Sequence, residues 1–451
     1  AGQLQPPHAN VNVCIQHGGH VGAVVATHNL VGLNCDTSHT TASKSCGQGT
    51  TASDLDIPKI LDLLPGTPRI VSRKNAFYWR KAKQTPILAT DQAKAWQMAT
   101  AWDANLGNIV WEYGALNLLN PYVTACLPPN DVSADADACV LPTANLLYIP
   151  ENSTELPSSV SGLTSFFTQQ VRQLNVPSIL IGIGLQAELP DDQDIPQAVA
   201  SMQLHESSVR LLTEVALRAP HGFSVRGNVT SHLCKRAGIL SACVPLGCPS
   251  FTINREANLG SVLQRDWDRA VQKSQLGSLR IAIHLPQMQL GGRFHTEVYN
   301  LLIELYRTYD GFFVLQSRYD YPSLKSRLLK AGSEWNTSRI KFFVNMEDWM
   351  HELKQVDFVI GCRIHGTMAA VSAGKASILL ATDFRTLEMA QSMNIPHLHG
   401  DELSKLVANN FSLPDLIART AGSFDFKLLE QTRLAAIQKY HHILQGIGLE
   451  I

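Results

Sequence analysis

The sequence predicts an α/β protein with two Rossmann-like domains, each built on a parallel sheet. Three observations support this prediction. From residue 104 onward, short apolar runs alternate with segments whose apolar residues recur at helical spacing. The alternation is interrupted by a polar stretch, residues 254–278, and then begins again. Apolar residues make up 45% of the chain, yet no apolar run approaches the ~18–20 residues that would span a bilayer. Such alternation is typical of parallel sheets covered by helices.

The first predicted domain covers residues 104–254, and residues 1–103 are predicted to be an N-terminal elaboration packed on it. Apolar periodicity predicts its helices, and apolar runs bounded by Gly, Pro or Asn predict its strands. In chain order these elements are helix 105–119, strand and loop 135–150, helix 162–174, strand 178–186, helix 206–218, strand 222–227, helix 230–237 and strand 241–247.

The second predicted domain covers residues 255–425, and residues 426–451 form a C-terminal segment. Residues 254–278 are interpreted as the connection between the domains. The elements that follow are strand 280–285, helix 296–309, strand 312–316, helix 323–330, strand 340–344, helix 347–354, strand 357–361, helix 366–373, strand 376–381 and helix 386–393. The amphipathic segment 428–444 predicts a last helix that crosses back to the first domain.

Composition excludes several classes of partner. The chain has 37 Lys and Arg against 38 Asp and Glu, so it lacks the basic excess of a nucleic-acid binder or the cationic face of a membrane-surface protein. Its nine cysteines include no C-x-x-C pair, which argues against a zinc framework, and no metal is predicted. The first residues lack the features of a signal peptide. Oligomeric state is not determined by the sequence.

The strongest local signal is DFVIGCRIHGTMAAVSAG, residues 357–374. An apolar strand leads to Arg363 and His365, and Gly366 with Thr367 opens the next helix. In open α/β sheets ligands lie at the carboxyl ends of strands. A guanidinium, an imidazole and a helix N-terminus at one such end suit a phosphate or a carboxylate. The alternative is a structural ion pair of Arg363 and a capping or core histidine.

Three further segments place polar residues after strands. FSVRGNVT delivers Arg226, which would face Arg363 across a cleft between the domains, or is a surface arginine in a turn. PLGCPSFTIN offers Ser250 and Asn254 as hydrogen-bond donors, or is a simple turn. LATDFRTLE contains Asp383, Arg385 and Glu388, and Asp383 is as well suited to capping the helix as to catalysis.

These segments resemble the polysaccharide pyruvyl transferase family. The resemblance rests on GCRIHGTMAAVSAG followed by LATDFR, on SVRG-x-x-T, GCPS and IGIGLQ, and on GNIVWEYGALNLL and PTANLL. Together they span roughly residues 104–400 in the family's order, whereas the first hundred residues do not resemble the family core. The resemblance implies a fold similar to that of type B glycosyltransferases, with a cleft between the two domains. It also implies transfer of pyruvate from phosphoenolpyruvate to a hydroxyl pair of a terminal hexose, galactose or mannose, as a ketal.

By the resemblance, Arg226 and Arg363 bind phosphoenolpyruvate, and Ser250, Asn254 and Arg385 are weaker candidates. His365 acts as general acid beside anions that raise its pKa. Asp383 or Glu388 supplies the base, and Gly366 with Thr367 contributes backbone donors. No cofactor beyond the donor substrate is required, because arginines neutralise the leaving phosphate.

Two alternatives stay open on sequence grounds. One is a nucleotide-sugar glycosyltransferase of the same fold, which would want a carboxylate for the ribose and a slot for the base. The other is a carbohydrate-binding homologue without turnover, although a sugar-only binder has no need of clustered cations. The compartment is undetermined: a lipid-linked acceptor implies the cytoplasm, and a glycoprotein acceptor implies the Golgi lumen.

Overall fold

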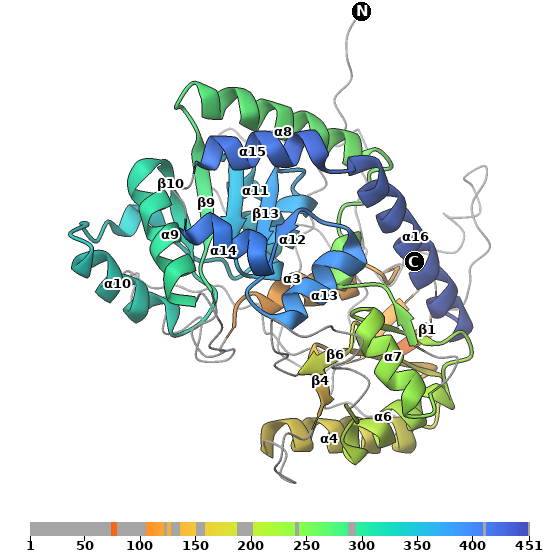
Figure 1. Ribbon diagram of the computed structural model, residues 1–451. Helices are drawn as coiled ribbons and strands as arrows, with labels where there is room; N and C mark the ends of the chain where they lie inside the picture. The colour runs from red at the N-terminus through yellow and green to blue at the C-terminus, as the bar shows by residue number, and fades with distance from the viewer. Residues whose placement is uncertain are drawn as a thin grey trace, which may run out of the picture. The chain divides into compact units, whose positions relative to one another are not determined.

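The computed structural model describes residues 74–78, 105–120, 124–127, 136–149, 158–186, 202–239, 243–286, 295–408 and 412–449. Two parallel sheets with helices packed on them form its framework (Figure 1). The predicted α/β class with two Rossmann-like sheets is therefore confirmed. Within the described residues, no helix has the length and apolar character to cross a membrane.

The first sheet has four parallel strands in the order β2-β1-β3-β5. These strands are β1 (Lys74–Tyr78), β2 (Thr124–Leu127), β3 (Ala138–Pro142) and β5 (Ser178–Ile181). Strand β1 lies in the range 1–103, which the sequence predicts to be an N-terminal elaboration. These five residues instead form an internal strand of the first sheet. The remainder of that range lies outside the described residues.

Two strand pairs extend this part of the chain. Strand β4 (Asn145–Tyr148) pairs with β6 (Gly184–Gln186), and β7 (Phe223–Val225) pairs with β8 (Cys243–Pro245). The predicted strand 178–186 is thus divided into β5 and β6, because Gly182 between them has φ +70 and turns the chain. The helices here are α3 (Asn108–Leu116), α4 (Ser158–Leu174), α6 (Glu206–Ala216) and α7 (Asn228–Arg236), followed by the short 3₁₀ helix η2 (Pro249–Thr252).

The second sheet has six parallel strands in the order β11-β10-β9-β12-β13-β14. They are β9 (Arg280–His284), β10 (Asp310–Val314), β11 (Ile340–Lys341), β12 (Phe358–Gly361), β13 (Ser377–Leu380) and β14 (His397–Leu398). The interleaved helices are α9 (His295–Thr308), α10 (Asp320–Lys330), η3 (Thr337–Arg339), α11 (Met346–Leu353), α12 (Ile364–Ser372) and α13 (Phe384–Met393). Strand β14 and the helices α14 (Gly400–Ala408) and α15 (Leu413–Ser423) were not predicted.

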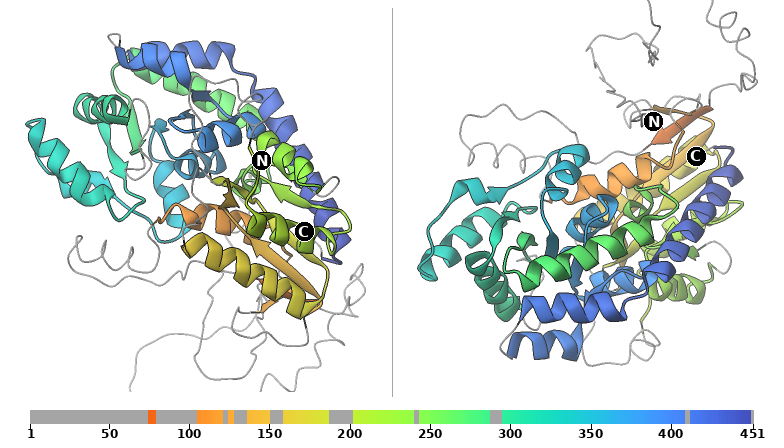
Figure 2. Two further views of the ribbon diagram at one scale, coloured as in Figure 1. Left: turned by 60° about the horizontal axis from the view of Figure 1, so that its bottom comes forward. Right: turned by 90° about the horizontal axis from the view of Figure 1, so that it is seen from above.

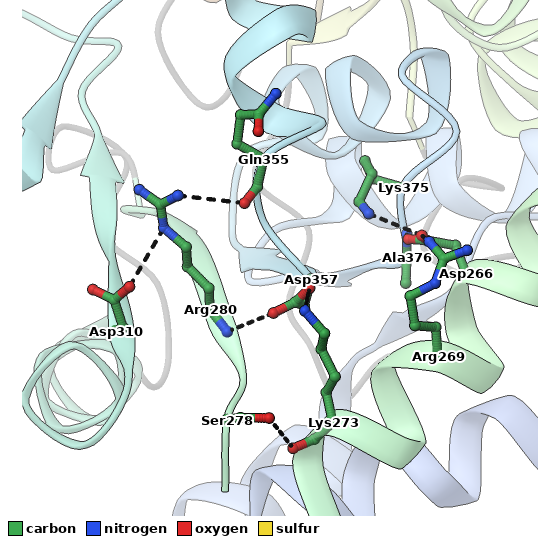
Figure 3. Close-up of polar contacts among 10 residues, drawn as sticks. All are labelled: Asp266, Arg269, Lys273, Ser278, Arg280, Asp310, Gln355, Asp357, Lys375 and Ala376. Carbon is green, nitrogen blue, oxygen red and sulfur yellow. Dashed lines mark hydrogen bonds and ion pairs between the residues drawn. The ribbon is translucent and has the colours of Figure 1, made fainter. Parts of the chain in front are cut away.

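The polar stretch interpreted as a connection contains a 17-residue helix, α8 (Leu259–Gln275). Its carboxylates and amines are bound at the amino ends of the strands in the second sheet (Figure 3). Lys273 Nζ lies 2.7 Å from Asp357 Oδ1, and Asp357 Oδ2 accepts a hydrogen bond from the backbone N–H of Arg280. Asp266 binds Lys375 Nζ at 2.8 Å and the N–H of Ala376. The amino edge of this sheet is therefore closed by paired charges.

The C-terminal helix α16 (Phe426–Gly446) packs into both hydrophobic cores. Phe426, Leu429 and Ala436 belong to the core around the second sheet, whereas Tyr440 and Leu444 belong to the core around the first. Figures 1 and 2 show the dark-blue α16 starting beside α8 and ending near the orange and yellow strands of the first sheet. This helix joins the two sheets from outside, and the predicted domain boundaries at 104, 255 and 426 stay predictions.

Candidate functional site

Two arginines and a histidine lie at the carboxyl ends of strands in different sheets. Arg226 directly follows β7, Arg363 lies between β12 and α12, and His365 is the second residue of α12. All three side chains are buried, with exposed fractions of 4%, 6% and 8%. The charges of Arg226 and Arg363 both act on the His365 ring, so the carboxyl ends of β7 and β12 lie in the same region of the molecule. The two arginines are 137 positions apart in the chain.

Arg226 is held by its own side of this cluster. Its Nε donates to the carbonyl oxygen of Gly182 at 3.1 Å, and its Nη1 donates to Asn145 Oδ1. Burial, together with the positive charge of Arg385, lowers the pKa of the Arg226 guanidinium, whereas Glu388 acts in the opposite direction. The guanidinium is therefore fixed by neutral acceptors, and among the described residues no carboxylate is hydrogen-bonded to it.

Arg363 has a carboxylate partner that the sequence did not reveal. Its Nη2 lies 2.6 Å from Oδ1 of Asp320, the first residue of α10, and its Nε donates to the carbonyl oxygen of Leu285. Asp320 is 1% exposed and also accepts the backbone N–H groups of Gln316 and Ser317. Nη1 of Arg363 has no hydrogen-bond partner among the described residues. One face of the guanidinium is thus anchored, and one donor is left for a ligand.

His365 is neutral in this arrangement. Burial, and then the positive charges of Arg226, Arg363 and Arg385, lower the pKa of its imidazole to about 3. Its Nε2 has no partner within the part of the chain that the structure describes. The expectation that neighbouring anions raise this pKa therefore applies only to a state in which a ligand supplies the anions.

The start of α12 contributes fewer donors than expected. The N–H groups of Gly366 and Thr367 both donate to the carbonyl oxygen of Arg363, at 3.1 and 3.3 Å, and close the first helical turn. By helix geometry, the open amides are those of the first two positions, Ile364 and His365. Gly366 and Thr367, which the sequence assigned to anion binding, therefore shape the turn and do not offer free amides.

Two further residues belong to this carboxyl edge and were missed. His284 ends β9, the strand between β10 and β12, and Gln316 follows β10. Both are 0% exposed, and neither the ring nitrogens of His284 nor the amide atoms of Gln316 find partners among the described residues. Burial, and then Arg363, lower the pKa of His284 to about 3. Inspection of the residues after the apolar runs RIAIH and FFVL would have found both.

Asp383 acts as the N-cap of α13. Its Oδ1 accepts the N–H of Thr386 at 3.0 Å, and its Oδ2 lies 3.3 Å from Arg385 Nη2. The sequence left two interpretations of Asp383 open, helix capping and catalysis, and these contacts are those of a helix cap. Arg385 is brought into the cluster, because its charge acts on both His365 and Arg226.

Glu388 reaches from α13 to the first turn of α7. Its two oxygens accept the N–H of Thr230 at 2.7 Å and the hydroxyl of Thr230 at 3.0 Å. The N-cap residue of α7, Gly227, has no side chain to cap the helix, so Glu388 fulfils this function from the other sheet. Burial raises the pKa of the carboxyl. Helix capping alone explains these contacts of Glu388, without a role in substrate binding or as a catalytic base.

Ser250 and Asn254 lie at the opposite end of α12 from His365. The Ser250 hydroxyl contacts the sulfur of Cys248 at 3.0 Å, and Asn254 Nδ2 donates to the carbonyl oxygen of Ser372, the last residue of α12. A nine-residue helix is about 13 Å long. Both candidates have partners inside the protein, and the partner of Ser250, Cys248, interacts electrostatically with Arg226.

The glycines of the family-like motifs make room for the cluster. An added Cβ would lie 2.4 Å from Arg226 Cδ at Gly184, 2.3 Å from Glu388 Cγ at Gly227 and 2.4 Å from the His284 ring at Gly366. Each distance is shorter than real Cβ atoms show. The motif glycines are therefore explained by close approach of the same side chains that form the site.

Taken together, the arginines, the neutral imidazole and the unpaired polar atoms form a buried site suited to a small, highly charged anion. In the described ranges, no group of three or more His, Cys, Asp or Glu side chains is arranged to hold a metal ion. The fold and this geometry define an α/β protein with a candidate anion site at the carboxyl edge of a parallel sheet.

Residues 164–383 match the family model described as polysaccharide pyruvyl transferase. The resemblance carried by the sequence motifs is confirmed over this range, which includes Arg226, Arg363 and His365. The match covers just under half of the chain and supports a transferase that modifies polysaccharides. No sequence among the curated proteins matches the chain.

Several solved structures show a distant likeness. HepE of Anabaena in complex with UDP-glucose is 12% identical with a TM-score of 0.39, covering 83% of this chain and 98% of its own. MnaA of S. aureus with UDP is 11% identical with a TM-score of 0.35, covering 80% and 90%. The UDP-GlcNAc 2-epimerase of Methanocaldococcus jannaschii is 11% identical with a TM-score of 0.37, covering 74% and 97%. Likenesses at this level carry no argument about function.

Proposed function

We propose that this protein transfers pyruvate from phosphoenolpyruvate to two hydroxyls of a terminal sugar, forming a ketal and releasing phosphate. The observation that carries the proposal is the convergence of Arg226, Arg363 and Arg385 on one buried histidine. Phosphoenolpyruvate has a phosphate and a carboxylate on three carbons, so it needs several cations within a small volume. The family match supports the same reaction class.

The three arginines would divide the work of holding this donor. Arg363 is oriented by Asp320 and keeps Nη1 for the ligand. Arg226 is oriented by the carbonyl of Gly182, and Arg385 by Asp383. Guanidinium groups fixed before the ligand arrives need no reorganisation when negative charge moves onto the leaving phosphate, and this preorganisation is the main source of electrostatic catalysis.

His365 would act as the general acid. Its Nε2 gives a proton to the methylene carbon of the enol, which leaves the adjacent carbon electron-poor. One sugar hydroxyl adds to that carbon and loses its proton, which restores the proton of His365. A second hydroxyl then displaces the phosphate, which takes up the second proton. The products are the ketal and inorganic phosphate, and no oxidant or reductant is consumed.

The acceptor side is less defined by the residues. Asp383 has the geometry of a helix cap, so its role as base remains a prediction, and Glu388, Ser250 and Asn254 are left out because their polar atoms are bound within the protein. A terminal galactose or mannose is proposed as acceptor on the family resemblance. The released phosphate and the added mass of the ketal identify the reaction for any acceptor.

The test measures phosphate release from phosphoenolpyruvate with a panel of galactosides and mannosides, and the ketal by mass. We expect His365→Gln to lower the rate about 10²–10⁴-fold, in the range of a lost general acid. Arg385→Gln should raise the KM for the donor. His205→Asn, at the N-cap of α6, is the control and should behave as wild type because asparagine also caps helices.

Calorimetric binding and the phosphate-release assay together separate the alternatives. Wild-type protein that binds UDP- or GDP-sugars and not phosphoenolpyruvate would support the glycosyltransferase. Binding of galactosides with no phosphate release from any acceptor would support the carbohydrate-binding homologue. If His365→Gln turned over at the wild-type rate, His365 would not be the general acid, but the proposed reaction would stand.

A further inference from the structure

Arg226 differs from the other two arginines of the candidate site in its hydrogen-bond partners. Arg363 Nη2 lies 2.6 Å from Asp320 Oδ1, and Arg385 Nη2 lies 3.3 Å from Asp383 Oδ2. Arg226 is 4% exposed, and its side chain donates to two uncharged oxygens among the described residues. Of these three arginines, Arg226 is therefore the one whose charge is not offset by a hydrogen-bonded carboxylate of the described residues.

One of the two uncharged partners is Asn145, the first residue of β4. Nη1 of Arg226 donates to Asn145 Oδ1, and Nε donates to the carbonyl oxygen of Gly182 at 3.1 Å. A guanidinium is planar and carries its donors in a rigid fork, so two anchored nitrogens fix the direction of the third. Neither bond uses Nη2, which is the nitrogen left for a ligand.

Strand pairing places Asn145 beside Arg226. In the pairing of β4 with β6, Asn145 lies opposite Gly184. An isolated bridge joins Ile183 to Val225, and the N–H of the next residue, Arg226, donates to the carbonyl oxygen of Ile183 at 2.9 Å. The Arg226 side chain then passes so close to Gly184 that a Cβ there would lie 2.4 Å from its Cδ. The asparagine is thus delivered by strand register, which fixes it more firmly than a surface loop would.

We propose that Asn145 is a positioning residue for Arg226: its amide oxygen fixes the guanidinium as a carboxylate would, but leaves the positive charge intact for the donor. The inference rests on the proposed function, in which Arg226 binds phosphoenolpyruvate. That donor carries about three negative charges at neutral pH, most of them on the phosphate. Its site has to combine fixed geometry with uncancelled positive charge, and an asparagine bound to an arginine supplies both.

Other titratable groups near Arg226 act on it without a hydrogen bond to its guanidinium, within the described part of the chain. Glu388 acts through its charge, while its two oxygens accept the N–H and the hydroxyl of Thr230. Cys248 and Tyr440 also lie close enough to act on Arg226, but burial raises the pKa of both, so they are neutral at pH 7. The neutral amide of Asn145 therefore sets how much of the charge of Arg226 reaches a ligand.

Two substitutions of Asn145 separate charge from geometry. Asn145→Asp keeps the shape and the acceptor oxygen but brings a negative charge to the guanidinium. The dissociation constant for phosphoenolpyruvate should therefore rise about 10–100-fold, the value of one hydrogen bond to a charged group. Asn145→Leu removes the acceptor and leaves the charge, so the dissociation constant should rise about 5-fold. The order reverses in stability: Asn145→Asp should keep the wild-type urea midpoint, whereas Asn145→Leu should lower it because a donor of the buried Arg226 loses its partner.

Titration calorimetry with phosphoenolpyruvate and with inorganic phosphate measures binding, and urea unfolding measures stability. In the phosphate-release assay, Asn145→Asp should raise the KM for phosphoenolpyruvate and change kcat less, because the lost attraction acts on the bound donor and on the transition state alike. The matched control is Asn175→Asp. Asn175 Oδ1 accepts a hydrogen bond from Nη2 of Arg218 at 3.3 Å in an exposed position, so the same substitution at the same kind of contact should leave donor binding unchanged.

A purely structural asparagine would give a different pattern. If Asn145→Leu weakened both stability and donor binding more than Asn145→Asp, the amide would serve only to pack Arg226. That result, or equal donor binding by the wild type and Asn145→Asp, would overturn the positioning role while the proposed function stands.

The proposed function fails in a distinguishable way. If the wild type bound inorganic phosphate but neither bound nor turned over phosphoenolpyruvate, the proposed function would be wrong. The phosphate affinities of Asn145→Asp and Asn145→Leu would then still decide the role of Asn145 toward Arg226. A wild type that bound neither anion would overturn both proposals.

Discussion

Substitutions of Glu388 distinguish a structural role of this carboxylate from a catalytic one. Its carboxylate crosses from α13 to α7 and binds the N–H and the hydroxyl of Thr230. The informative pair of changes is Glu388→Ala, which removes both acceptors, and Glu388→Gln, which keeps the shape and one acceptor oxygen. A base must be a carboxylate, whereas a cap needs only an acceptor, so the pair distinguishes the two roles.

The magnitude follows from the groups left behind. In Glu388→Ala the N–H and the hydroxyl of Thr230, a residue that is 0% exposed, lose their partners. A buried unsatisfied polar group costs about 1–3 kcal/mol, and loss of an N-cap costs about 0.5–2 kcal/mol. We therefore expect a loss of roughly 2–5 kcal/mol in the free energy of unfolding. The glutamine amide keeps one acceptor oxygen for Thr230, so Glu388→Gln should cost only about 1 kcal/mol.

Urea unfolding followed by far-UV circular dichroism measures the stability, and phosphate release measures the rate. Glu388→Gln should retain most of the wild-type rate. The control is Glu206→Gln on α6, whose side chain is 79% exposed and which should change stability by less than about 0.5 kcal/mol. If Glu388→Gln abolished turnover at unchanged stability, Glu388 would be the base after all; if it destabilised as much as Glu388→Ala, the cap would require the charge.

Two other predictions concern the buried charges of the site. His284 has a pKa of about 3 in the folded protein against an ordinary value of 6.5, so the unfolded chain binds more protons between these pH values. The contribution of His284 to stability is therefore present above pH 6.5 and lost as the pH falls toward 3. His284→Leu should reduce this acid sensitivity by at most roughly 5 kcal/mol, and identical urea midpoints for both proteins from pH 7 to 4 would contradict it. Arg363→Ala and Asp320→Ala should each lower the free energy of unfolding by about 3–5 kcal/mol, because each leaves a buried charge unpaired. The double variant should lose less than the sum of the two single losses, and additive losses in the same unfolding assay would disprove the pairing.

The alternation of strands and helices from residue 104 to 393 could be predicted because each apolar run and each helical period is local. Helix α8 was interpreted as a connection because polar residues are frequent in it. Its buried positions, Leu259, Leu263, Trp267 and Ala270, follow helical spacing, so the signal was present. Strand β1 gave no such signal, since its position between β2 and β3 depends on pairing with residues about 50 to 60 positions away.

The candidate site was predictable to the extent that strand ends were. Arg226, Arg363 and His365 each follow an apolar run, and the parallel topology brings such residues to one edge. Their partners were not predictable. Glu388 meets Thr230 from 158 residues away, and Asp320 meets Arg363 from 43 residues away. Whether a carboxylate serves as base, cap or counter-ion depends on these tertiary contacts, and no local pattern encodes them.

The electrostatics of the cluster connect the overall neutrality of the chain to the proposed chemistry. With 37 basic and 38 acidic residues, the chain has almost no net charge, yet burial and then the charges of three arginines keep the pKa of the His365 imidazole near 3. With a pKa near 3 the imidazole is neutral at pH 7, and a neutral imidazole is a poor proton donor. On the proposed function, phosphoenolpyruvate brings both the negative charge that offsets the arginines and the carbon that receives the proton. Binding of the donor would therefore raise the pKa of His365 and arm the acid, whereas a neutral sugar alone would not.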